Sequence, residues 1–347
     1  MGVIIGVILH ALGGFASGSF YIPYKKVRGW SWESYWLVGG LFSWIAAPTI
    51  FGLATVPGLF DILSDAPRES IFWCYVMGML WGIGGLTFGL SMRYLGLSLG
   101  MSIALGYCSF FGTIIPPLWD GTLGILFDTT SGLMILLGLG VCLLGIAICG
   151  WAGMRKEGEM SEEAKKETIQ EFNYFKGLMV ATCSGIMSSC MAFGLAAGKP
   201  IAQMAIDRGV DPLWQNNVVL VVVLLGGLTT NLIWSVYLNI KNKSSSDYTD
   251  STTPLLANYI FCAVAGTTWY LQFFFYGMGS SKMGKYDFSS WTLHMAFIII
   301  FSNLWGLYFK EWKGSTKPTL RIMLIGIAIV ILSTMIVGYG NYLGSQE

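Results

Sequence analysis

The sequence predicts an all-α polytopic membrane protein in which ten transmembrane helices form two inverted five-helix repeats. Three observations support this fold class. The 347 residues are 54% hydrophobic and 11% charged, whereas an ordinary soluble chain is about 25% charged. Ten long stretches contain no Asp, Glu, Lys or Arg, and glycine and tryptophan positions of the first half recur in the second.

Each charge-free stretch is long enough for one spanning helix. About 20 apolar residues cross a hydrocarbon core about 30 Å thick, and the shortest stretch has 22 residues. Buried helices of a soluble protein would carry polar residues at helical spacing, which these stretches almost lack. The ten stretches are 1–24, 34–60, 70–92, 94–119, 129–154, 177–198, 212–240, 251–281, 288–309 and 322–346.

The positions of Lys and Arg predict the orientation in the membrane. Fifteen of the 20 basic residues lie in the connections after helices 1, 3, 5, 7 and 9. Cytoplasmic connections accumulate Lys and Arg, so we expect these connections in the cytoplasm and both termini outside it. The first helix lacks a charged leader and a cleavage site, so we expect it to be retained.

The most hydrophilic connection divides the chain into two halves of five helices. Residues 1–154 are predicted to form the first repeat, 155–175 a charged cytoplasmic connection, and 176–347 the second repeat. A displacement of 188 residues superimposes glycines and a tryptophan of the two halves, which indicates a duplication. The matching pairs are Gly78 and Gly266, Trp81 and Trp269, Gly89 and Gly277, and Gly96 and Gly284.

An odd number of helices per repeat forces the second repeat to enter the membrane from the opposite side. Inverted repeats of this kind are typical of transporters that work by alternating access. The net charge of +1 gives no basic surface for nucleic acid. An intramembrane aspartyl protease would need a second motif, GxGD, which is absent from the sequence. Solute transport is therefore the predicted class of function.

Several sequence blocks are long and unusual: HALGG at 10–14, PYKKVRGWSWE at 23–33, WGIG at 81–84, SMRYLGLSLG at 91–100, WYLQFFFY at 269–276, YDFSSWTLHM at 286–295 and KEW at 310–312. In these blocks the chain resembles the L-rhamnose/proton symporter family. The resemblance covers nearly the whole chain and is weaker in the loops and in helices 6, 7 and 10. It implies the ten-helix fold of the drug/metabolite transporter superfamily. It also implies uptake of L-rhamnose, with L-lyxose and L-mannose as further candidates, driven by protons across the cell inner membrane.

A carrier of neutral sugars needs hydrogen-bonding groups for hydroxyls and aromatic faces for C–H surfaces. Trp269, Gln272 and Tyr276 stand at i, i+3 and i+7 on one face of helix 8, and Trp81 is the first-half counterpart of Trp269. We predict that these four residues contact the sugar. The alternative is that the tryptophans are packing or interfacial residues.

Both histidines, His10 and His294, lie inside charge-free stretches. Ionisable residues at membrane depth are functional by default, so we predict that they contact the sugar or the proton, and a hydrogen bond to a neighbouring helix is the alternative. Glu33 and Asp287, at helix starts, are the predicted proton-coupling carboxylates, and favourable interaction with the helix dipole is their alternative role.

No cofactor or metal site is expected. The seven cysteines all lie in predicted spans and none forms a CxxC pair. The expected partners are a small neutral deoxy-sugar, a proton and membrane lipid. A carrier or exporter of another small solute and sodium-coupled sugar uptake remain alternatives.

Overall fold

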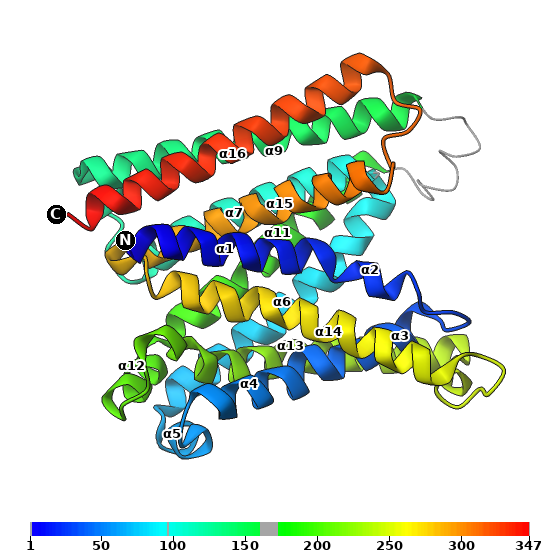
Figure 1. Ribbon diagram of the computed structural model, residues 1–347, viewed down its shortest axis with the longest axis horizontal. Helices are drawn as coiled ribbons and strands as arrows, with labels where there is room; N and C mark the ends of the chain where they lie inside the picture. Colours follow the sequence, from blue (N-terminus) through cyan, green and yellow to red (C-terminus); the bar gives the residue numbers. More distant parts are fainter. Residues whose placement is uncertain (1, 96, 160–172, 347) are drawn as a thin grey trace.

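The computed structural model describes residues 2–95, 97–159 and 173–346, and these ranges contain helices and no strand (Figure 1). Part of the predicted cytoplasmic connection, 160–172, lies outside the described residues. The helices are α1 (Gly2–Ser19), α2 (Tyr21–Tyr24), α3 (Trp32–Leu41), η1 (Phe42–Ala46), α4 (Ala47–Thr55), α5 (Leu59–Asp65), α6 (Arg68–Leu95), α7 (Leu97–Trp119), α8 (Ile125–Asp128), α9 (Thr130–Glu159), α11 (Tyr174–Ala197), α12 (Lys199–Asp207), η2 (Pro212–Trp214), α13 (Asn216–Asn242), η3 (Ser245–Tyr248), α14 (Leu255–Ser280), η4 (Gly284–Ser289), α15 (Ser290–Tyr308) and α16 (Lys317–Gly344).

Nine helical segments of the described chain are long and apolar enough to cross a membrane, which confirms an all-helical, polytopic membrane protein. They correspond to nine of the ten charge-free stretches. The remaining stretch forms α14, which has 26 residues and no charge. It is less hydrophobic than the other nine because it contains amides and aromatic hydroxyls, including Gln272 and Tyr276.

The helices run side by side, so the bundle has two ends (Figure 1). Both termini lie at the same end, together with α5 and α12; we call this the α12 end. The connections α2–α3 and α13–α14 lie at the opposite end. α9 and α16 pair along one flank, and α1 packs between α14 and α15.

Glycines allow several of these helices to approach backbone to backbone. A Cβ atom on Gly78 of α6 would lie 2.0 Å from the carbonyl oxygen of Val223 on α13. A Cβ atom on Gly266 of α14 would lie 2.0 Å from the carbonyl oxygen of Gly39 on α3. Small residues at helix crossings are typical of membrane bundles, where close packing replaces the hydrophobic effect between helices.

The second span contains one irregular turn. Residues Phe42–Ala46 form a π-helical turn between α3 and α4. Such turns contain an extra residue and are frequent at functional sites. Here the turn includes Trp44, whose side chain is almost completely buried against Trp269 of α14.

Candidate functional site

The α12 end of the bundle contains a polar cavity of about 480 Å³. Its wall consists of the last turns of α7, α11 and α14, the first turns of α12 and α13, and η4, so both halves of the chain contribute. Pockets that bind small molecules have volumes of roughly 300–1,000 Å³. The polar side chains of the wall are Asp120, Thr122, Lys199, Gln203, Gln215, Asn216, Tyr276, Ser280, Ser281 and Asp287.

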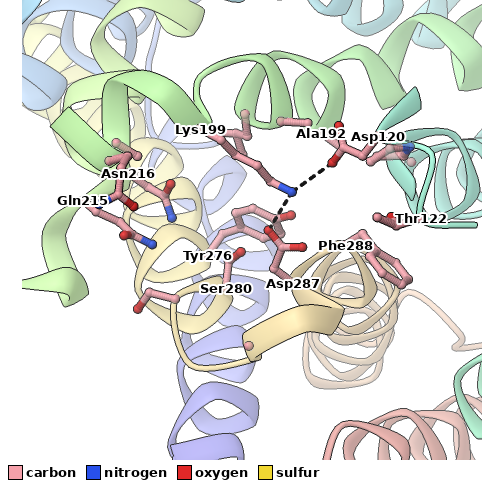
Figure 2. A pocket seen from close by; sticks show the side chains of 18 residues that line it. Asp120, Thr122, Ala192, Lys199, Gln215, Asn216, Tyr276, Ser280, Asp287 and Phe288 are labelled. Carbon is pink, nitrogen blue, oxygen red and sulfur yellow. Dashed lines mark hydrogen bonds and ion pairs between the residues drawn. The ribbon is translucent and has the colours of Figure 1, made fainter. Parts of the chain in front are cut away.

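Lys199 lies between two carboxylates in this wall (Figure 2). Its Nζ atom is 3.1 Å from Oδ2 of Asp120 and 3.3 Å from Oδ2 of Asp287. Asp120 follows α7, Lys199 begins α12, and Asp287 lies in η4, so the bridge joins three segments that are distant in the sequence. The three side chains are 34%, 50% and 32% exposed, which means that water in the cavity reaches them.

Tyr276 forms the floor of the cavity, and two predicted sugar contacts lie directly against it. Its ring centroid is 5.4 Å from that of His10 on α1 and 5.3 Å from that of His294 on α15. Trp291 of α15 packs on the same ring at 5.5 Å. The structure therefore brings His10, Tyr276 and His294 together beneath the Lys199 bridge.

Both imidazoles have unused hydrogen-bonding capacity. His10 and His294 are completely buried, and none of their ring nitrogens has a hydrogen-bond partner among the described residues. Buried polar groups are normally paired, so these nitrogens are candidates to bind a ligand or water. The His10 ring lies on the backbone of Gly279, where a Cβ atom would be 2.8 Å from its Nε2.

Trp81 and Trp269 lie deeper in the bundle, on the side of Tyr276 away from the cavity. Their ring centroids are 5.3 Å apart, and both contact Phe273 of α14. Phe273 in turn contacts His294. Trp36 and Trp44 continue this aromatic column toward the opposite end of the bundle.

Gln272 is buried between α14 and α1 and does not line the cavity. A Cβ atom on Gly13 of α1 would lie 2.9 Å from the Gln272 carbonyl oxygen. The two helices therefore touch one turn below Tyr276, and Gln272 lies nearer to the middle of the bundle than the cavity does.

Glu33 lies at the other end of the bundle, in the first turn of α3, and lines no part of the cavity. Its Oε1 atom accepts hydrogen bonds from Asn242 Nδ2 at 2.9 Å and from Ser244 Oγ at 2.7 Å. Nearby, Asp247 accepts a hydrogen bond from Ser34 of α3 at 2.8 Å. These contacts attach the start of α3 to the connection that follows α13.

Three asparagines of α13 have different partners. Asn217 donates to Thr55 at 2.8 Å, and Asn231 accepts from the indole of Trp36 at 3.1 Å, so both join α13 to the second span. Asn216 donates to the carbonyl of Gly277 at 3.0 Å and also lines the cavity.

The sequence alone did not identify Asp120, Lys199 or Gln215 as cavity residues. All three lie at helix ends, where a charged side chain usually extends to the membrane interface. A signal was nevertheless present. The even-numbered connections must meet at one end of the bundle, and Asp120, Lys199 and Asp287 each adjoin one of them.

A second cavity of about 220 Å³ lies at the opposite end, between α7, α9 and α15. Its lining is mostly apolar, with Lys156, Glu311 and Trp312 at its rim. Lys156 lies over the Trp312 ring at 5.0 Å, and Glu311 pairs with Lys25 at 3.4 Å.

The family model for the L-rhamnose-proton symport protein (RhaT) matches residues 1–342. The chain belongs to the RhaT family. It is 38% identical over 342 residues to the L-rhamnose-proton symporters of Yersinia pestis (strain Pestoides F) and Yersinia pseudotuberculosis serotype O:1b (strain IP 31758), a match that covers 97% of this chain and 98% of each relative. RhaT membership confirms the predicted family and the prediction of a transporter rather than an enzyme.

One solved structure, described only as the crystal structure of a protein, has the same fold. It superposes with a TM-score of 0.57 at 12% sequence identity and covers 95% of each chain. For this RhaT-family chain, that likeness supports the fold and carries no information on the substrate.

Proposed function

We propose that this chain carries L-rhamnose together with a proton across the cell inner membrane. The observation that carries the proposal is the polar cavity of about 480 Å³, lined by both halves of a chain of the RhaT family. Relatives that share 38% of its residues over 97% of its length are named L-rhamnose-proton symporters.

The cavity suits a neutral deoxy-sugar. Asp120, Lys199, Gln215 and Asn216 supply donors and acceptors for ring hydroxyls, and the Tyr276 ring supplies an aromatic face. Polar groups that are placed for hydroxyls favour a polyol over an apolar solute, because an unpaired buried polar group is costly.

The deeper predicted contacts extend this site. His10 and His294 adjoin Tyr276, and their ring nitrogens have no hydrogen-bond partner in the part of the chain that the structure describes. In our proposal the sugar passes from Tyr276 to these imidazoles and then to Gln272, Trp81 and Trp269, near the middle of the bundle. An occluded site at that depth is usual for carriers built from repeats.

Asp287 is the better placed of the two proton-coupling candidates. It lines the cavity, contacts a cation there, and is partly exposed to cavity water. Glu33, at the opposite end, has the contacts expected of a carboxylate that anchors a helix start. We propose that protonation and sugar binding together permit the inward-facing state.

We propose ten spans, with α14 as the eighth, arranged as two inverted repeats of residues 1–154 and 176–347. Equivalent glycines support this architecture. Gly78 on the third span touches the seventh, and Gly266 on the eighth touches the second. A duplication in which corresponding helices cross in the same way would produce this pair of contacts.

The cavity opens at the α12 end, and the distribution of Lys and Arg favours this end as the external one. The described conformation is then outward-facing. The opposite end is closed by the aromatic column of Trp36, Trp44, Trp81 and Trp269 and by the hydrogen bonds of Glu33.

A proton assay in liposomes tests this function. L-Rhamnose added to proteoliposomes without an imposed gradient should raise the pH of the external medium, in sodium-free buffer as well, and a protonophore should abolish the change. The same assay with L-lyxose and L-mannose gives the order of preference among the three sugars. No pH change with any of the three sugars and a change with another solute would support another carrier of this fold. Uptake of labelled rhamnose that requires sodium and changes no pH would support sodium coupling.

The dependence of the same pH change on rhamnose concentration tests the site. Tyr276→Phe removes one hydroxyl from the cavity floor, and the loss of one hydrogen bond should raise the rhamnose Kd about fivefold. Tyr339→Phe, on the exposed face of α16, is the matched control and should leave the Kd unchanged.

A further inference from the structure

The two carboxylates of the cavity share one cation. Among the described side chains that line the cavity, the charged ones are Asp120, Lys199 and Asp287. With both carboxylates ionised, this group has a net charge of −1, although each carboxylate lies within hydrogen-bonding distance of the same ammonium. We call these three residues the charge triad.

Among the side chains that the structure describes, the segments packed against η4 bring no further charge to the triad. η4, which carries Asp287, packs against α7, α14, α15 and α16. α7 and α15 contain no Asp, Glu, Lys or Arg, α14 adds only the neutral phenol of Tyr276, and the basic residues of α16 lie in its first five positions, at the opposite end. The His294 imidazole of α15 is separated from the triad by Tyr276.

We propose that Asp120, Lys199 and Asp287 act as one unit that takes up a single proton with each sugar. This inference rests on the proposed function of the cavity as the sugar site. When the cavity closes around a neutral sugar, the triad leaves bulk water. An uncompensated carboxylate is then costly to bury, whereas one added proton makes the triad neutral.

The near-equal distances explain why the two carboxylates belong to one titrating unit. Lys199 Nζ is 3.1 Å from one and 3.3 Å from the other, so either carboxylate can take the proton while its neighbour keeps the ammonium. The proton comes from external water, is held on a carboxylate oxygen during the transition, and returns to water on the other side. Asp120 and Lys199 are thus coupling residues alongside Asp287.

The number of protons moved per sugar tests this proposal, because it should follow the charge of the triad. It is measured from the membrane potential that just balances a known rhamnose gradient in proteoliposomes. We expect one proton for the unmodified protein, none for Asp120→Asn, two for Lys199→Gln, and one again for the double variant Asp120→Asn with Lys199→Gln. The balance potential does not depend on how tightly a variant binds the sugar, so weaker binding leaves the ratio readable. Counterflow of labelled rhamnose at saturating concentration shows which variants are folded and still carry the sugar.

The outcomes separate the two proposals. Counterflow in every variant with an unchanged ratio of one would overturn the role of the triad and leave rhamnose transport intact. Absence of rhamnose counterflow in the unmodified protein would overturn the proposed function and this inference with it. Asp120→Asn and Lys199→Gln should shift the proton-to-sugar ratio in opposite directions. If one of these variants does not fold, the ratio measured for the other still tests the role of the triad.

Discussion

Trp81 and Trp269, which are 188 residues apart, are in direct contact, with ring centroids 5.3 Å apart and planes inclined at 32°. In the proposed duplication they occupy equivalent positions in the two halves of the chain. Two residues related by a twofold axis can touch only if they lie close to that axis. The contact is therefore where we expect the two proposed repeats to meet.

Removal of either indole should destabilise the protein. Trp81→Ala and Trp269→Ala should each lower the free energy of unfolding by about 3–5 kcal/mol, as large-to-small core substitutions do. Since the rings share one contact, the double variant should lose less than the sum, by about 0.5–3 kcal/mol. Unfolding of the protein in detergent measures these free energies. Trp151→Ala, half exposed on α9, is the control, and strict additivity would contradict the coupling.

Replacement of the histidines should separate stability from sugar binding. His10→Phe and His294→Phe keep a ring and remove nitrogens that have no hydrogen-bond partner among the described residues. Stability should rise by about 1–3 kcal/mol, because an unpaired buried polar group is removed. The rhamnose Kd should rise about fivefold for each variant. An unchanged Kd in both would place the sugar away from these rings.

Glu33→Gln should weaken the anchor of α3 without affecting coupling. The amide keeps one acceptor oxygen for Asn242 and Ser244 but loses the charge, so we expect stability to fall by about 1–3 kcal/mol. The rhamnose Kd and the pH-driven accumulation should stay the same, since Glu33 is distant from the cavity. Loss of accumulation in this variant, with counterflow retained, would make Glu33 the proton site instead.

Gly226→Ala should disturb the contact between α13 and α6. The added Cβ atom would lie 2.1 Å from the carbonyl oxygen of Tyr75, which is backbone and has no rotamer to change. We expect a loss of about 1–3 kcal/mol or more in stability. Gly85→Ala is the matched control on α6, because its Cβ atom would meet nothing within 4 Å. That variant should gain up to about 1 kcal/mol from helix propensity.

Asp65→Asn should leave the pH profile of transport unchanged. Asp65 pairs with Arg208 at 2.6 Å at the α12 end, and this guanidinium holds the pKa of the carboxyl below its usual value of about 4. A lowered pKa means that the pair is formed at neutral pH and is lost only as the pH falls through that lowered value. Rhamnose uptake between pH 5 and 8 measures this, and a shifted profile would show that surface pairs contribute to coupling.

The positions of the spans could be predicted because an absence of charge over 22 or more residues has one main physical explanation. The pairing of His10 with Tyr276, and of Trp81 with Trp269, depends on which helix faces which neighbour. Helical spacing places residues on a face of one helix and does not say what that face meets. The contacts between α1, α14 and α15 therefore could not be predicted from the sequence and are visible only in the three-dimensional structure.

The charge triad was missed for a different reason. Lys199 lies at a helix end, where most basic side chains extend to the membrane interface. In this chain α12 begins at Lys199 directly after Gly198, and the short helix brings the side chain back over the cavity. The π-helical turn at Phe42–Ala46 leaves no signal in charge or hydropathy patterns.

The aromatic column also has an optical consequence. Indoles as close as those of Trp81 and Trp269 interact electronically, and the sign and size of that interaction depend on the angle between the rings. One indole belongs to α6 and the other to α14. A rotation of one half of the bundle against the other would therefore change the near-ultraviolet circular dichroism of the unlabelled protein, so the chain contains its own reporter of conformational state.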